Sequence, residues 1–228
     1  MYEINIKNNL EFINNEIKTA CEKCGRNYQE ITLVGVSKTK SAELINQAID
    51  CGLRNIGENY VQEIIGKYNS LKPADLHFIG HLQSNKAKQI VPIATLIHSA
   101  DSLSLLKEIN KQAKIIGKIQ DVLLEINISE ENTKFGLEGN SLSECLDFAN
   151  NLGSIRIKGL MGMAPFTENK EKCRPYFQNL KKLFDSLPDE NRIFLSMGMS
   201  GDFREAIYEG SNMIRIGTAI FGERNYNN

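Results

Sequence analysis

Short apolar runs that alternate with helical stretches along the whole chain constrain the fold more than any other feature of the sequence. The runs occupy residues 31–38, 53–59, 76–82, 95–101, 121–129, 155–163, 192–200 and 213–222. The stretches between them, such as residues 41–52, have the period of amphipathic helices. Alternating strands and helices predict parallel βαβ units, and eight units after one leading helix predict a single closed (β/α)8 (TIM) barrel. An open doubly wound sheet is the alternative.

Length and composition narrow the class of protein. The 228 residues are expected to form one domain, residues 1–228, with ordinary globular composition. Lys plus Arg total 27 against 28 Asp plus Glu, so nothing indicates a nucleic-acid partner. No apolar run reaches the ~18 residues of a membrane span, and the first residues lack a signal-peptide pattern. Five cysteines cannot all pair, which is typical of a reducing compartment. We expect a cytoplasmic protein with no membrane partner.

Neither the cysteines nor the histidines have the spacing of a metal site. Cys21 and Cys24 form a CxxC at the end of a helical pattern, without the preceding strand of a redox motif or the second ligand pair of a zinc site. His77, His81 and His98 also lack ligand spacing. We therefore predict two structural thiols and no metal.

Lys38 ends the first apolar run on the same strand face as Val34 and Val36. If that face points inward, Lys38 lies at the mouth of the barrel. Partial desolvation there lowers the pKa of a lysine and frees its amine to attack an aldehyde. The structural alternative is a lysine that extends from a strand end to solvent. Lys40, already in the following turn, is the competing candidate.

Two glycine-rich segments near the carboxyl end predict an anion site. Residues 196–202 include the end of the seventh run and the turn after it, and residues 215–222 form most of the eighth run. The loops after these two strands are where (β/α)8 barrels most often bind phosphate. Glycines allow backbone N–H groups to approach an anion, and serine and threonine hydroxyls donate to it. The alternative is that the glycines only serve turns.

Arg215 alternates with two isoleucines and therefore shares a strand face with Gly217. A permanently charged guanidinium that points into a barrel mouth is costly without a partner. That partner is either a carboxylate such as Glu58 or a bound ligand. We expect His81 and His98 to be hydrogen-bonded structural imidazoles.

Together, these motifs carry a family resemblance. In order along the chain they are residues 36–40, 57–60, 77–86, 196–202 and 215–222. Over nearly the whole chain they closely resemble the pyridoxal phosphate homeostasis proteins, the YggS/PROSC family. That family is similar to the barrel domain of alanine racemase, known as fold type III. Ser41 stands where a proline is common, and His81 occupies a variable position.

The resemblance implies one cofactor, pyridoxal 5′-phosphate (PLP), and a role for six residues. Lys38 would form the internal aldimine with PLP, Asn59 would lie at the side of its ring, and Arg215 would face its pyridine nitrogen. The residues implied for its phosphate are Ser200, Gly217 and Thr218. The resemblance assigns no catalytic residue.

By the same resemblance the protein holds, buffers and delivers PLP within the cell, as a monomer, with apo forms of PLP-dependent enzymes as its partners. Arg215 would keep the ring nitrogen unprotonated and the ring a poor electron sink. We expect no room at this length for the second domain through which racemases position a further acid/base. The alternatives are an amino-acid racemase or other minor PLP enzyme, and an aldolase without cofactor, which would need neither Arg215 nor a phosphate site.

Overall fold

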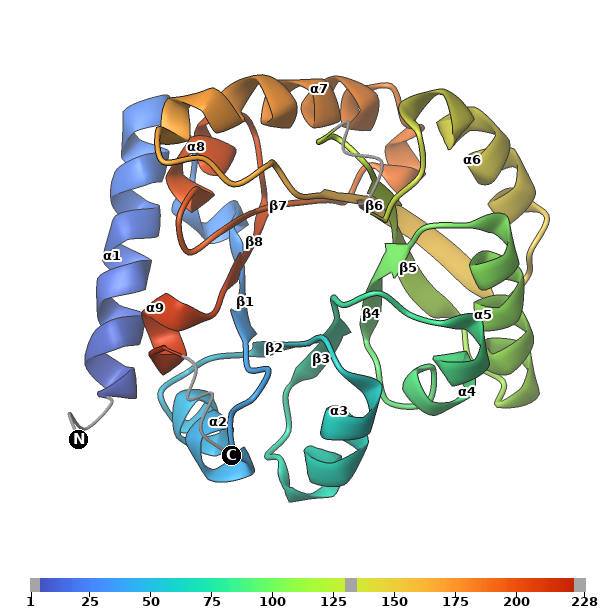
Figure 1. Ribbon diagram of the computed structural model, residues 1–228, viewed down its shortest axis with the longest axis horizontal. Coiled ribbons are helices and arrows are strands. Elements are labelled where there is room, and N and C mark those ends of the chain that lie inside the picture. The colour runs from blue at the N-terminus through green and yellow to red at the C-terminus, as the bar shows by residue number, and fades with distance from the viewer. Residues whose placement is uncertain (1–4, 130–134, 224–228) are drawn as a thin grey trace.

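The chain forms a closed barrel of eight parallel strands. The computed structural model describes residues 5–129 and 135–223. Each strand is hydrogen-bonded to the next in sequence order, and β8 pairs with β1 to close the ring (Figure 1). The strands are β1 (Thr32–Val36), β2 (Asn55–Glu58), β3 (Asp75–Phe78), β4 (Leu96–Ala100), β5 (Gln120–Ile126), β6 (Ile155–Gly162), β7 (Phe194–Met199) and β8 (Met213–Ile216). The predicted barrel is confirmed, and the open sheet is excluded.

Helices surround this ring. They are α1 (Ile6–Cys24), α2 (Ala42–Asp50), α3 (Val61–Lys67), α4 (Ala87–Ile90), α5 (Leu103–Ile115), α6 (Leu142–Asn150), α7 (Arg174–Asp185), α8 (Phe203–Tyr208) and α9 (Thr218–Phe221). In the described part of the chain, none of them is both long and apolar enough to cross a membrane.

The leading helix α1 lies outside the ring along α8 and α9 (Figure 1). Its buried stripe includes Leu10, Ile13 and Ile17, which have the spacing of one helix face. Gly25 ends the helix in the left-handed conformation at φ 70°, as glycine does at low cost. Cys21 and Cys24 are free thiols, and both lie near the end of this helix, which confirms the predicted helical position of the CxxC.

Strand alternation divides the core into an inner and an outer part. Five apolar side chains from five strands pack together inside the barrel: Val34, Leu96, Leu123, Met161 and Met213. Alternate residues of the same strands, such as Ile97 and Leu124, pack outward against the helices. Because all strands are parallel, their carboxyl ends meet at one mouth. The polar residues that follow these strands are thereby brought together.

Candidate functional site

The turn that carries Lys38 is held in an unusual conformation. Lys38 is half-buried and lies two residues after the end of β1. The next residue, Thr39, is the only non-glycine residue within the described ranges with positive φ, at 63°. Its N–H donates to Oε1 of Glu63 at 2.6 Å. A threonine in this region costs on the order of 1–3 kcal/mol and persists only where its surroundings enforce it.

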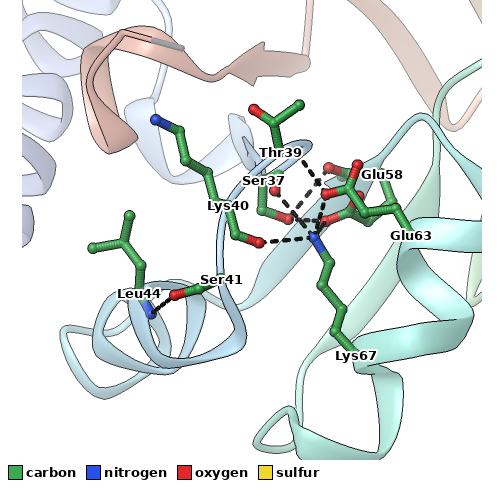
Figure 2. Close-up of polar contacts among 9 residues, drawn as sticks. Ser37, Thr39, Lys40, Ser41, Leu44, Glu58, Glu63 and Lys67 are labelled. Carbon is green, nitrogen blue, oxygen red and sulfur yellow. Dashed lines mark hydrogen bonds and ion pairs between the residues drawn. The ribbon is translucent and has the colours of Figure 1, made fainter. Parts of the chain in front are cut away.

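The enforcing group is the buried ammonium of Lys67 on α3. Its Nζ donates to the carbonyl oxygens of Ser37 and Lys40, both at 3.2 Å, and so spans the turn from end to end. It also lies 2.8 Å from Oε1 of Glu58, which accepts a hydrogen bond from the Ser37 hydroxyl. Figure 2 shows these contacts converging on one nitrogen. Lys67 thus fixes the backbone on both sides of Lys38.

Glu58 is not the partner of Arg215, contrary to one of the two alternatives considered for that guanidinium. Glu58 is fully buried, but it faces outward from the barrel and pairs with Lys67. Desolvation raises the pKa of Glu58 in spite of the attraction to Lys67. Alternation along β2 explains the mismatch, because Glu58 and its neighbour Gly57 point to opposite faces of the barrel wall.

Arg215 lies inside the barrel and is only 4% exposed. Its Nη1 donates to the carbonyl and the hydroxyl of Ser196, at 2.8 and 2.6 Å, and its Nη2 donates to the carbonyl of Gly162 at 3.1 Å. Desolvation lowers the pKa of Arg215 to about 10. A guanidinium has five N–H donors. Among the described residues, no acceptor is found for those that remain.

A chain of hydrogen bonds continues from Arg215 through the barrel interior. The hydroxyl of Ser196 lies 3.1 Å from Nδ1 of His98, whose Nε2 lies 2.9 Å from Nδ1 of His77. Nε2 of His77 lies 3.2 Å from Oδ1 of Asn55, and the amide nitrogen of Asn55 donates to a backbone carbonyl.

This chain fixes the protonation of both histidines. The Asn55 oxygen can only accept, so His77 carries its proton on Nε2 and accepts at Nδ1 from Nε2–H of His98. His98 then accepts from the Ser196 hydroxyl. Burial lowers the pKa of His77 to about 4 and that of His98 well below its usual value. Both rings are neutral at neutral pH, and the interpretation of His98 as a structural imidazole agrees with these contacts.

The two glycine-rich loops meet at the mouth. The N–H of Gly217 donates to the hydroxyl of Ser200 at 3.2 Å, which joins the loop after β7 to the loop after β8. Gly198 adopts φ 93°, and a Cβ there would lie 2.6 Å from the Cβ of Ala206. This glycine is therefore required by the turn. Thr218, at the start of α9, is exposed next to this junction.

Asn59 lies on the other side of β1, directly after β2. Its Oδ1 is buried and has no hydrogen-bond donor within the residues the structure describes. Gly80 packs against the Asn59 backbone so closely that a Cβ at that position would lie 2.2 Å from the Asn59 carbonyl oxygen. β8 pairs with β7 and β1, and β1 pairs with β2, so the candidate residues lie at the carboxyl ends of four adjacent strands, β7, β8, β1 and β2.

Other polar residues of the mouth do not join this group. His81 pairs with Asp101 at 3.0 Å and stacks on Phe135. Lys40 donates to the carbonyl oxygens of Gly222 and Glu223, which marks it as a structural lysine. In the ranges 5–129 and 135–223, no group of three or more His, Cys, Asp or Glu residues could hold a metal ion.

Sequence reasoning missed Lys67 and Glu125. Lys67 follows Glu63 by four residues, a helical pairing that the sequence displays without showing its third partner, Glu58. Glu125 is 4% exposed and follows three consecutive apolar residues of β5, Val122, Leu123 and Leu124, and this charge within an apolar run was the available signal. Desolvation, reinforced by Asp101, raises the pKa of Glu125 to about 7, although Arg215 opposes the shift.

Comparison with known proteins first defines the class. A family model described as alanine racemase, N-terminal domain, matches residues 9–225. The pyridoxal phosphate homeostasis protein of Aquifex aeolicus (strain VF5) is 46% identical over 215 residues, which cover 92% of this chain and 94% of that one. The protein of the same name from Escherichia coli (strain K12) is 40% identical over 233 residues and covers 97% of each chain.

A solved structure agrees. PipY of Synechococcus elongatus PCC7942, with PLP bound, is 31% identical to this chain and superposes with a TM-score of 0.77, covering 90% of this chain and 99% of that one. The fold and its polar mouth thus define a barrel of the alanine racemase N-terminal class. Within that class, the chain belongs to the pyridoxal phosphate homeostasis protein family.

We predict that Lys67→Met destabilises the protein by about 3–5 kcal/mol, because it leaves the buried Glu58 charge without its partner. Urea denaturation at pH 7.5 measures this loss. The control is Lys72→Met, which removes an exposed ion pair with Asp50 and should cost less than about 1 kcal/mol. Adding Glu58→Gln to Lys67→Met should restore part of the stability. Equal losses of stability for the two lysine variants would contradict the role of Lys67 in holding the turn and the buried Glu58 charge.

We also predict a pH signature for Glu125. Because its pKa is about 7 in the folded protein and 4.5 in the reference state, the folded chain retains a proton that the unfolded chain has lost between these values. The stability of the wild type relative to Glu125→Gln should therefore fall as pH rises from 4.5 to 7. The fall should be on the order of 3 kcal/mol, at about 1.4 kcal/mol per pKa unit. Chemical denaturation across pH 4–8 measures it, and a constant difference would show that Glu125 is not desolvated.

Proposed function

We propose that this protein binds PLP at the barrel mouth and serves intracellular PLP homeostasis by holding the cofactor and delivering it. The observation that carries the proposal is the convergence of three features on one end of the barrel. These are a lysine on an enforced turn, a buried guanidinium with unused donors, and two joined glycine-rich loops. The names of the relatives and the PLP bound to PipY support the same function.

The residues present fit each part of the cofactor. A phosphate has acceptor oxygens for the hydroxyls of Ser200 and Thr218 and for the N–H groups around Gly217. The pyridine nitrogen is a neutral acceptor, which is what the remaining donors of Arg215 lack. The buried Oδ1 of Asn59 lacks a hydrogen-bond donor among the described residues, and this orphaned atom faces the same mouth in our proposal.

PLP supplies an aldehyde that reacts with a primary amine, and we propose the Lys38 amine for that contact. The turn fixes the position of the Lys38 backbone. Lys67 and Glu63 fix the backbone on either side of Lys38, so that its side chain starts from one defined point at the mouth. Orientation of this kind reduces the entropy lost when the cofactor binds.

We propose a binding and delivery role in preference to catalysis because of Arg215. A guanidinium donates hydrogen bonds at neutral pH, with a pKa of about 10 even when buried here. Opposite a ring nitrogen it favours the unprotonated form, which is a poor electron sink for reactions at an amino acid. The proposed partners are apo forms of PLP-dependent enzymes, and the proposed working form is a cytoplasmic monomer.

The first test concerns Lys38. Borohydride treatment of the PLP-loaded wild type should fix the cofactor to the peptide that contains Lys38, as read by peptide mass mapping. Lys38→Ala should abolish this adduct while the protein stays folded, because it removes the amine from a residue that is only half-buried. Lys86→Ala, at a recess that Asn59 also lines, is the matched control and should keep the adduct. An adduct mapped to Lys40 or Lys86 in the wild type would overturn the assignment.

The second test concerns the phosphate. Replacing both Ser200 and Thr218 by alanine should weaken PLP binding, since each charge-assisted hydrogen bond contributes about 1.5–3 kcal/mol. Pyridoxal, which has the same ring and aldehyde but no phosphate, is the control ligand and should lose far less. Titration of both ligands followed by visible absorbance measures the two effects. Equal losses would mean that the phosphate is held elsewhere.

The third test concerns delivery. Mixing the PLP-loaded protein with an apo PLP-dependent enzyme should restore that enzyme's activity faster than the same concentration of free PLP does. The Lys38→Ala variant loaded with PLP is a control for passive release. Restoration no faster than with free PLP would contradict delivery and leave only storage.

A further inference from the structure

A cavity lies next to the loop that carries Ser200, one of the residues proposed for the cofactor. It has a volume of about 530 Å³ and lies at the carboxyl ends of β5, β6 and β7. Met199 and Gly201, which flank Ser200, form part of its wall. None of the residues proposed for PLP lines it. This size and place are typical of a small-molecule site.

The wall of this cavity is apolar and open to solvent. Phe166 is 90% exposed, and Phe135, Met163 and Met199 are also exposed large apolar side chains that line the cavity. Single exposed apolar residues are ordinary, but a group gathered around one hollow indicates a binding surface. Methionine side chains adapt their shape to different apolar ligands. The wall therefore fits a compact hydrocarbon or aromatic group.

One buried carboxylate gives the cavity its polarity. Glu125 lines the cavity, and only 4% of its surface is exposed. Among the residues that the structure describes, no side chain or backbone group donates a hydrogen bond to this carboxylate. Desolvation, reinforced by the nearby Asp101 and opposed by Arg215, raises the pKa of Glu125 to about 7. A ligand with a cationic donor would remove this penalty.

The other charged groups around the cavity already have partners. The Asp202 carboxylate accepts from the Met199 N–H at 2.6 Å. Lys170 donates to the carbonyl of Thr167 at 2.6 Å and lies 4.8 Å from the centre of the Phe166 ring. Of these three charged residues in the lining, Glu125 is thus the one whose side chain has no hydrogen-bond donor among the described residues.

We propose that this cavity binds a small primary amine with an apolar side group, its ammonium on Glu125 and its apolar part against Phe166 and Met199. The site brings an amine next to the loop that carries Ser200. This amine site shares no residue with the proposed PLP contacts, so the proposal does not depend on the proposed function.

The test uses two probes of the same shape, 2-phenylethylamine and 2-phenylethanol, titrated by calorimetry into the full chain at pH 8. At this pH Glu125 is ionised and the amine is still protonated. The amine should bind roughly tenfold or more tightly than the alcohol, as one charge-assisted hydrogen bond requires. Glu125→Gln should remove this preference. Asp121→Asn, on the same strand but paired with Arg156, is the matched control and should keep it.

A second variant locates the probes. Phe166→Ala, at a position too exposed to affect folding, should weaken both probes to a similar extent. An amine that binds no better than the alcohol, or a preference that survives Glu125→Gln, would overturn the proposal. So would binding unaffected by Phe166→Ala. Titrations are carried out both on the cofactor-free chain and on the chain with PLP fixed by borohydride. The cofactor-free titration tests the amine site even if no Lys38 adduct forms, so failure of this proposal and failure of the PLP assignment can be distinguished.

Discussion

A permanent positive charge inside the barrel is the constraint on which the rest of the site depends. Arg215 is almost wholly buried, and Born desolvation of such a group costs several kcal/mol unless polar groups replace water. Ser196 and the carbonyl of Gly162 replace part of that water. His98 can accept from Ser196 only while its ring is neutral, and a second positive charge nearby would repel Arg215. The interior is thus arranged to keep one cation in place with donors to spare.

The barrel wall separates this interior network from a second network outside it. Ser37 faces outward and joins Glu58 and Lys67, whereas the next residue, Lys38, belongs to the opposite face. Stability and binding can therefore be assigned to different sides of one strand. The outer ion cluster holds the turn, and the inner face is left to contact a ligand. Substitutions in the outer cluster should affect folding before they affect chemistry.

The parts of this structure that follow from local pattern were predictable from the sequence. Apolar runs at regular spacing predicted the eight strands, and strand alternation placed Arg215 inside the barrel. The family motifs indicated where the two loops after β7 and β8 would meet, and Gly217 does contact Ser200. What could not be predicted is which distant side chain partners each charge. His98 and Ser196 are 98 positions apart. The choice of Ser196 over Glu58 for Arg215 depends on which face of β2 turns inward, a property of the assembled barrel.

The measurement that tests the account most directly is the protonation state of the pyridine nitrogen in bound PLP. Nitrogen-15 NMR of the wild-type protein loaded with PLP labelled at that atom reports it through the chemical shift. If Arg215 donates to the ring nitrogen, the nitrogen should be unprotonated at neutral pH and remain so as the pH is lowered to about 6. A protonated ring nitrogen at pH 7 would contradict the placement of Arg215 and, with it, the arrangement of the cofactor at this barrel mouth.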